Sequence, residues 1–261
     1  MTRRRNVVAV IPARYGSTRF PGKPLADLAG KPMIVWTMNQ VKKAGTVDAV
    51  LVATDDSRIQ SAVIEAGGTA VMTPSDLPSG SDRVAFVVKK QPADIVVNVQ
   101  GDEPLIDPGH IDAAVAALLS DPESAVSTLA TPITELKTLQ NPNVVKVVLD
   151  AFGRAVYFSR APIPYTANPS PSPQNNTYLR HIGLYAYRSE FLLQYTRNPA
   201  CWMERVERLE QLRILYLGGK IATAVVSGGG MSVDTPEDLA RVRALIDAGG
   251  TGSLNPLLSG D

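Results

Sequence analysis

Short blocks of apolar residues alternate with longer amphipathic stretches through the first half of the chain. Five blocks rich in Val, Ile, Leu and Ala have the length and composition of buried strands. Between them, apolar residues recur at helical spacing. The predicted strands cover residues 6–12, 49–54, 69–72, 94–99 and 125–131, and the predicted helices cover 32–44, 57–66, 82–89 and 108–119. Because strands and helices alternate, we expect an α/β fold with right-handed βαβ units and a doubly wound, mostly parallel sheet.

The second half of the chain has more closely spaced strands. A stretch rich in Pro, Ser and Asn at 161–177 predicts a long loop. The last helix is predicted to begin after Thr235, a typical N-cap residue that is followed by Pro. Further strands are predicted at 144–149, 155–159, 182–187 and 221–226, and helices at 203–217 and 236–248. We therefore expect a single domain over 1–248, an inserted β-rich subdomain at about 133–217, and a flexible tail at 249–261.

A polar loop with the character of a phosphate-binding loop follows the first predicted strand. Its glycines allow close approach to an anion, and Arg14, Arg19 and Lys23 supply positive charge. The spacing is not that of a P-loop, because five residues separate the two glycines and Pro follows the lysine. The dinucleotide pattern G-x-G-x-x-G is also missing. The loop therefore predicts nucleotide binding of another kind, with a solvated basic turn as the alternative.

Two acidic residues follow other predicted strands. Asp102 comes after the strand at 94–99, and Asp234 after the strand at 221–226. Ligands of doubly wound sheets lie beyond the carboxyl ends of the strands, so both carboxylates are expected to face the basic loop. Carboxylates beside phosphates need a cation between them, and Mg²⁺ prefers such oxygen ligands. Taken alone, Asp102 could be a turn residue and Asp234 a capping residue of the last helix.

Composition and charge argue against several other functions. The chain has 261 residues, a formal net charge of +1 and no extended basic stripe, so we expect no nucleic-acid partner. Its apolar runs are shorter than a membrane span, so we expect no membrane insertion. The absence of a signal-peptide pattern and the single cysteine lead us to expect a cytoplasmic location. Cys201 is the only cysteine and there are two histidines, which argues against a zinc site and excludes a disulfide within the chain.

Many blocks of the sequence resemble the 3-deoxy-manno-octulosonate cytidylyltransferase (CMP-KDO synthetase) family. The first block reads IPARYGSTRFPGKP over residues 11–24. Others follow in order at 53–55, 79–83, 97–104, 141–146, 157–160, 180–185, 209–213 and 233–239. The resemblance covers about residues 6–245. It implies a nucleotide-diphospho-sugar transferase fold, and an enzyme that joins CTP to KDO, releases pyrophosphate and serves lipopolysaccharide assembly.

The resemblance also implies the roles of individual residues. The inserted region would bind the sugar and pair two subunits of a homodimer. The catalytic residues would be Lys23, Asp102 and Asp234, of which Asp102 and Asp234 would bind Mg²⁺. The nucleotide-binding residues would be Pro12, Ala13, Arg14, Ser17, Arg19, Lys23, Ser79, Arg83 and Gln100. The sugar-binding residues would be Arg160, His181, Tyr185, Glu210 and Gln211.

Several alternatives stay open at this stage. His181 and Tyr185 lie four apart on a predicted strand, so they share a face and could be core residues. Glu210 and Gln211 could belong to the solvated face of a helix, and Arg160 to the surface. A CMP-sialic acid synthetase would share the fold and the opening loop, although the blocks around His181 and Glu210 favour KDO. A glycosyltransferase of related fold and an inactive nucleotide-binding regulator are the remaining alternatives.

Overall fold

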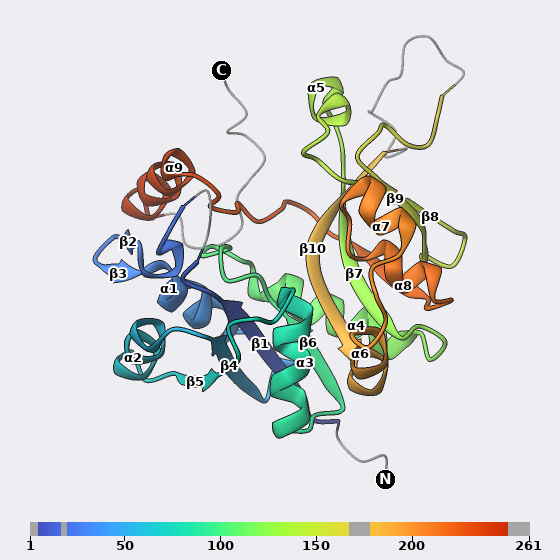
Figure 1. Ribbon diagram of the computed structural model, residues 1–261. Helices are drawn as coiled ribbons and strands as arrows, with labels where there is room; N and C mark the ends of the chain where they lie inside the picture. The colour runs from blue at the N-terminus through green and yellow to red at the C-terminus, as the bar shows by residue number, and fades with distance from the viewer. Residues whose placement is uncertain (1–4, 17–19, 167–177, 250–261) are drawn as a thin grey trace. The chain divides into compact units, whose positions relative to one another are not determined.

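The computed structural model describes residues 5–16, 20–166 and 178–249. The chain forms two compact units (Figure 1). The first contains Met1–Asp112 and Gly228–Asp261, and the second contains Ala113–Ser227. The predicted insertion at 133–217 lies inside the second unit. Of the predicted tail at 249–261, all but Gly249 falls outside the described residues.

The first unit is built on four parallel strands in the order β6-β1-β4-β5. Their bounds are β1 Val7–Ala13, β4 Ala49–Thr54, β5 Thr69–Met72 and β6 Ile95–Asn98. The helices are α1 Met33–Val41, α2 Ser57–Glu65, α3 Gly80–Lys90 and α9 Pro236–Asp247, while α4 Pro108–Ser120 crosses the boundary between the units. The predicted parallel α/β arrangement is confirmed.

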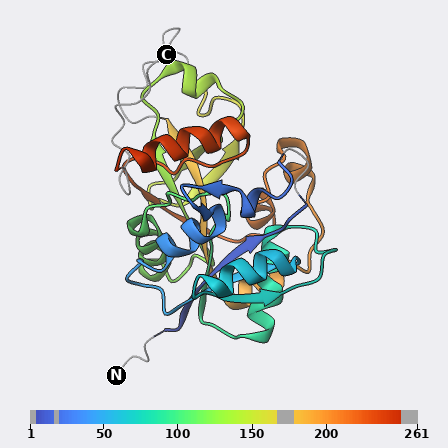
Figure 2. The ribbon, with the colours of Figure 1, turned by 90° about the vertical axis from the view of Figure 1, so that its left-hand side faces the viewer.

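The core of the first unit forms because its strands are apolar on both faces. Val10 and Ile11 point to opposite sides of β1, and neither is exposed to solvent. A short hairpin, β2 Asp27–Leu28 and β3 Lys31–Pro32, extends the unit beyond the sheet. The start of the last helix was predicted correctly, since Thr235 caps α9 and accepts the Asp238 N–H. In Figure 2, α9 (red) lies against the hairpin (blue), where Leu28 and Val242 share one apolar cluster.

The second unit is β-rich and of mixed direction. Strand β7 Val126–Pro132 pairs in parallel with β11 Ile221–Val225 and antiparallel with β10 Leu179–Arg188. Strand β8 Lys146–Leu149 joins β10 to β9 Ala155–Ser159. The helices are α5 Leu136–Gln140, α6 Ser189–Tyr195, α7 Trp202–Glu207 and α8 Leu212–Tyr216.

The single helix predicted at 203–217 is wrong, because two short helices occupy this stretch. Arg208 adopts a left-handed conformation with φ 55° and ends α7. The N–H groups of Arg208 and Leu209 both donate to the Glu204 carbonyl, as at many helix C-termini. Leu209 is buried behind this turn, and α8 begins only after Gln211. The periodicity continues through the break, so it concealed the turn.

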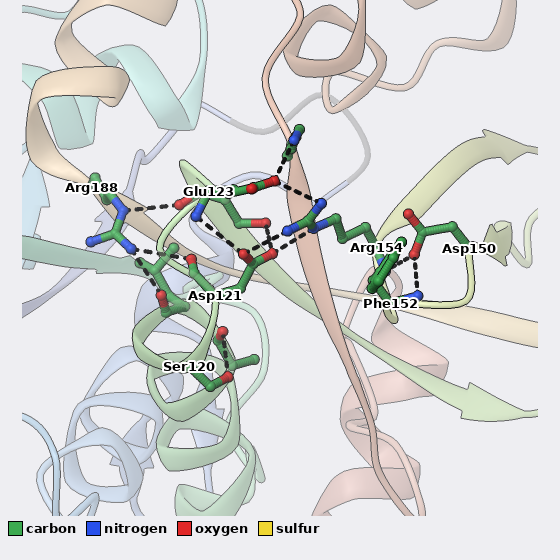
Figure 3. Close-up of polar contacts among 11 residues, drawn as sticks. Ser120, Asp121, Glu123, Asp150, Phe152, Arg154 and Arg188 are labelled. Atoms are coloured by element: carbon green, nitrogen blue, oxygen red, sulfur yellow. Dashed lines mark hydrogen bonds and ion pairs between the residues drawn. The ribbon is translucent and has the colours of Figure 1, made fainter.

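An ion-pair network joins the end of α4 to the strands of the second unit (Figure 3). Arg154, just before β9, donates from Nε and Nη2 to the two carboxylate oxygens of Asp121 at 2.7 and 2.9 Å. Arg188, at the end of β10, donates to the carbonyls of Ser124 and Leu118 at 2.9 and 3.1 Å. The Arg154 guanidinium lowers the pKa of Asp121 far below its ordinary value. The network therefore connects the C-terminal end of α4, the start of β9 and the end of β10.

We expect Asp121→Asn to lower the melting temperature at pH 7 by about 2–4 °C, because it removes one half of a two-point ion pair. A carboxyl whose pKa is lowered by folding stabilises the protein above its unfolded pKa of about 4, and this stabilisation is lost as the pH falls below it. The difference from wild type should therefore shrink below pH 4. Thermal unfolding at several pH values measures this.

Glu123→Gln is the matched control for this prediction. Glu123 pairs with Arg154 at 3.0 Å and with Lys220 at 2.5 Å, but its side chain is 61% exposed. Ion pairs of an exposed carboxylate contribute little, so this variant should melt close to wild type. A melting temperature of Asp121→Asn equal to that of Glu123→Gln at pH 7 would contradict the prediction.

Candidate nucleotide-binding site

A pocket of about 300 Å³ lies in the first unit at the carboxyl ends of β1 and β6. This is the edge at which doubly wound sheets bind ligands. Several of the residues predicted for the nucleotide and the metal meet there: Pro12, Ala13, Arg14, Lys23, Ser79, Arg83, Gln100, Asp102 and Asp234. The predicted residues Ser17 and Arg19 lie outside the described part of the chain. The pocket therefore brings together four segments that are separate in sequence: residues 12–24, 77–83, 100–102 and Asp234.

The centre of the pocket is an ammonium group held by two carboxylates. Lys23 Nζ donates to Asp102 Oδ2 at 2.7 Å, to the Val233 carbonyl at 2.8 Å and to Asp234 Oδ1 at 3.3 Å. The Lys23 side chain is 13% exposed, whereas the Asp102 and Asp234 side chains are 27% and 39% exposed. The Val233 N–H also donates to the Asp102 carbonyl at 2.9 Å, which fixes both segments. The two carboxylates thus face one space, as the sequence predicted.

The turn before Lys23 depends on a glycine. Gly22 has φ 72°, and a Cβ there would lie 3.2 Å from the Tyr15 ring. Its N–H donates to the Tyr15 carbonyl at 3.0 Å and closes the loop.

The Arg58 guanidinium stacks on the Tyr15 ring at 3.6 Å, and Asp56 holds that guanidinium through two hydrogen bonds. Sequence reasoning missed Arg58, because only the fold brings α2 to this loop.

The wall opposite the loop is the start of α3. Ser79 is the N-cap of this helix: its hydroxyl accepts the Asp82 N–H at 3.2 Å and donates to the Asp82 carboxylate at 2.7 Å. A helix N-terminus favours anions through its free N–H groups. Arg83 is buried, and Asp55 binds its guanidinium at 2.9 Å. Arg83 therefore lines the pocket with a guanidinium that is already paired with Asp55. Its contact with the nucleotide stays a prediction.

The predicted sugar-binding residues lie in the second unit. The rings of His181 and Tyr185 are 5.5 Å apart, and Phe158 meets His181 edge-on at 4.9 Å. Burial lowers the pKa of His181 to about 3, so its imidazole is neutral. Burial also raises the pKa of Tyr185 well above its ordinary value. The shared face predicted from their spacing is confirmed, and both groups are uncharged at neutral pH.

Arg160 is held by a carboxylate that sequence reasoning did not identify. Its backbone N–H donates to Glu207 Oε2 at 3.0 Å, and its Nε donates to the Glu207 carbonyl at 2.8 Å. Ser159 donates to the other Glu207 oxygen at 2.6 Å. The buried Lys146 ammonium binds three backbone carbonyls, including that of Arg160 at 2.5 Å. Arg160 is therefore a fixed group at the end of β9.

Glu210 and Gln211 lie in the break between α7 and α8. Gln211 is buried, which excludes the solvated helix face as its setting. Glu210 is partly exposed and accepts the Tyr195 hydroxyl at 3.0 Å. Because the turn at Arg208 interrupts the helix, both residues lie in a turn instead of on a regular helical face.

In the described part of the chain, the candidate metal ligands in the pocket are two carboxylates, Asp102 and Asp234, which do not form a complete coordination shell. Among the described residues, no group of three or more His, Cys, Asp or Glu side chains is placed to hold a metal ion. Mg²⁺ commonly uses one or two carboxylates and takes its other ligands from phosphates and water. Asp102 and Asp234 match that requirement.

In the described part of the chain, none of the helices is long and apolar enough to cross a membrane.

A parallel sheet with a basic loop after its first strand, paired carboxylates beside it and a helix N-terminus opposite defines a nucleotide-binding α/β protein of the nucleotidyltransferase class. A model of the cytidylyltransferase family matches residues 8–221. The 3-deoxy-manno-octulosonate cytidylyltransferase of Photobacterium profundum is 52% identical over 244 residues, which are 91% of this chain and 98% of the relative. That of Bdellovibrio bacteriovorus is 46% identical over 245 residues, or 94% and 99%.

Solved structures agree with these relatives. CMP:2-keto-3-deoxy-manno-octonic acid synthetase complexed with CTP has a TM-score of 0.88 at 43% identity, over 94% of this chain and 99% of that one. The chain belongs to the 3-deoxy-manno-octulosonate cytidylyltransferase family. A 4-diphosphocytidyl-2C-methyl-D-erythritol synthase from Anaerococcus prevotii, at 11% identity and a TM-score of 0.61 over 93% and 99% of the two chains, shares the fold alone.

We expect Arg58→Ala to weaken the binding of CTP, the nucleotide bound by the solved relative, roughly two- to fivefold. The reason is that the stack of Arg58 on Tyr15 supports the loop that carries Lys23. Isothermal titration of CTP measures the effect.

Lys90→Ala is the control for this prediction, since Lys90 lies over the Phe86 ring at 4.5 Å on α3, outside the pocket lining. It should bind CTP like wild type. Equal CTP affinities of wild type and Arg58→Ala would show that the stack does not hold the loop in its binding conformation.

Proposed function

We propose that the protein joins CTP and 3-deoxy-D-manno-octulosonate (KDO) to give CMP-KDO and pyrophosphate, and so activates KDO for lipopolysaccharide biosynthesis. The observation that carries this proposal is the meeting of Lys23, Asp102 and Asp234 in one pocket. It occurs in a chain 43% identical to a synthetase solved with CTP. A basic loop, a helix N-terminus and paired carboxylates are the parts that a nucleotidyl transfer requires.

The chemistry follows from charge placement. The anomeric hydroxyl of KDO attacks the α-phosphorus of CTP in line, and pyrophosphate leaves. The sugar supplies the nucleophile, so the protein's task is to position the reactants and stabilise charge. The Lys23 ammonium is a point charge suited to the negative charge that grows on pyrophosphate. Arg14 is an exposed residue of the pocket lining and adds a second cation for the triphosphate.

We propose Mg²⁺ as the cofactor and Asp102 and Asp234 as its protein ligands. When bound, the ion would neutralise phosphate charge and lower the pKa of the attacking hydroxyl. The support is the donor set: two partly exposed carboxylates facing one space, beside the groups that would bind phosphates. In the structure the Lys23 ammonium contacts both carboxylates, an arrangement compatible with a positive charge between them.

For the sugar, we propose contacts with Arg160, His181, Tyr185, Glu210 and Gln211. KDO carries one carboxylate and several hydroxyls, so its site needs a cation and many neutral hydrogen-bonding groups. Arg160 is the cation of this set. His181, whose pKa burial lowers to about 3, and Tyr185 are neutral groups able to hydrogen-bond hydroxyls.

We further propose that the protein is a homodimer and acts in the cytoplasm. Support for a dimer comes from the second unit, where α7 exposes Trp202 and Val206 at 58% and 75%. Large apolar side chains exposed together are typical of protein interfaces.

The test of this function is pyrophosphate release from CTP by the purified protein. We expect release only when CTP, KDO and Mg²⁺ are all present, and its loss when EDTA removes the metal. N-acetylneuraminate in place of KDO is the control sugar and should give no release. Release with N-acetylneuraminate but not with KDO would make the enzyme a CMP-sialic acid synthetase, and binding of CTP without turnover would make it a regulator.

We expect Lys23→Ala to lower kcat for pyrophosphate release by roughly 10²–10³-fold, the usual loss when one charge-stabilising donor is removed. Steady-state kinetics at saturating CTP and KDO measure it. The control is Lys42→Ala, which removes an exposed lysine whose contact is the Gly67 carbonyl. A kcat of Lys23→Ala within threefold of that control would reject the proposed role of Lys23.

A further inference from the structure

Thr128 lies at an irregularity in the pairing of β7 with β10. On one side of it Leu129 pairs with Ile182, and on the other Ser127 pairs with Ala186. Three residues of β10, Gly183 to Tyr185, therefore oppose the single residue Thr128. Such a bulge leaves backbone groups without ladder partners. A buried hydroxyl at this position can satisfy some of them.

The Thr128 hydroxyl has three polar neighbours. Thr128 is fully buried, and its Oγ1 lies 2.9 Å from the Leu184 carbonyl and 3.2 Å from the Ile182 carbonyl. The third neighbour is His181 Nε2, at 3.0 Å. Thr128 thus has one hydroxyl proton to donate and two neighbouring carbonyls, those of Ile182 and Leu184, that can only accept.

Counting protons assigns the tautomer of His181. A threonine hydroxyl donates once and accepts through its lone pairs. If it donated to Nε2, it would donate to neither carbonyl of the bulge, and leaving buried acceptors unsatisfied is costly. If it donates to the Leu184 carbonyl, its lone pairs face Nε2, and Nε2–H can donate to it. The second arrangement satisfies more groups, and it places the imidazole proton on Nε2.

We propose that Thr128 is a positioning residue that holds His181 as its Nε2–H tautomer, so that Nδ1 is an acceptor for a hydroxyl group of the sugar substrate. This inference rests on the proposed function. Nδ1 has no hydrogen-bond partner among the described residues. Phe158 and Tyr185 pack against the ring at 4.9 and 5.5 Å and limit its rotation.

The tautomer determines which group of the sugar His181 can recognise. An unprotonated Nδ1 accepts a hydrogen bond from a hydroxyl but repels a carboxylate, which can only accept. His181 therefore contributes to selectivity for a sugar hydroxyl, while a cation such as Arg160 has to meet the sugar carboxylate. The low pKa of His181, about 3, agrees with a neutral ring.

The tautomer can be measured directly in the wild-type protein. The chain has two histidines, His110 and His181, so an imidazole nitrogen-15 spectrum contains two ring systems. His181→Gln removes one of them and assigns the other. At pH 7 we expect the His181 signals of a protonated Nε2 and an unprotonated Nδ1. A proton on Nδ1 in the wild type would overturn the proposal, and this result does not depend on activity.

Two variants test the role of the hydroxyl. Thr128→Val keeps the shape but cannot accept from Nε2–H, so we expect a mixture of tautomers. We also expect a KM for KDO about five- to tenfold higher, with the KM for CTP unchanged. Thr128→Ser keeps the hydroxyl and should restore both the tautomer and the KM.

The two readouts separate failure of this inference from failure of the proposed function. An unchanged tautomer in Thr128→Val would overturn the positioning role. A changed tautomer with an unchanged KM for KDO would overturn the contact between His181 and the sugar. Absence of KDO-dependent pyrophosphate release in the wild type would instead reject the proposed function. If Thr128→Val does not fold, the wild-type spectrum and Thr128→Ser still decide the tautomer.

Discussion

The contact of the Lys23 ammonium with Asp102 and Asp234 is the constraint on which the pocket depends. It joins Lys23, in the loop after β1, to Asp102 and Asp234, which follow Lys23 in the sequence by 79 and 211 residues. Two carboxylates that face one space repel each other, so the arrangement needs a cation. Lys23 supplies that cation from within the protein. The return of the chain at Gly228 to the first unit is therefore required by the site, because without it Asp234 would be absent.

The two units present different kinds of polar group. In the first, charged side chains surround the pocket and the positive end of α3 faces it, which suits a triphosphate. In the second, the proposed sugar contacts include two neutral rings, Tyr185 and His181, and burial lowers the pKa of His181 to about 3. Neutral groups can both donate to and accept from hydroxyls, whereas cations can only donate. This difference matches the two proposed substrates, because CTP carries a polyanionic triphosphate whereas most polar groups of KDO are hydroxyls.

The sequence predicted the features that depend on local pattern. The predicted strands at 49–54 and 69–72 have the observed bounds, because short apolar runs mark strands. The last four residues of β4 are buried, whereas β5 is a partly exposed strand at the edge of the sheet. The helix predicted at 203–217 was wrong because the left-handed Arg208 leaves no trace in the periodicity. Arg58, Glu207 and Thr128 escaped notice because they act through contacts that only the tertiary fold creates. The sugar-binding candidates were named by resemblance, and nothing in the pattern around them distinguishes them from core residues.

Two of these unnoticed residues, Glu207 and Thr128, share a property that explains how the second unit can be specific. Three of the five residues proposed to touch the sugar are held by a residue outside that set: Arg160 by the Glu207 backbone carbonyl, His181 by the Thr128 hydroxyl and Glu210 by the Tyr195 hydroxyl. Groups that are fixed before binding lose little freedom when the ligand arrives, so more of each contact appears as affinity. They also cannot turn to accept a sugar with hydroxyls in other positions. Selectivity for one acidic sugar would therefore reside as much in the supporting residues as in those that touch it.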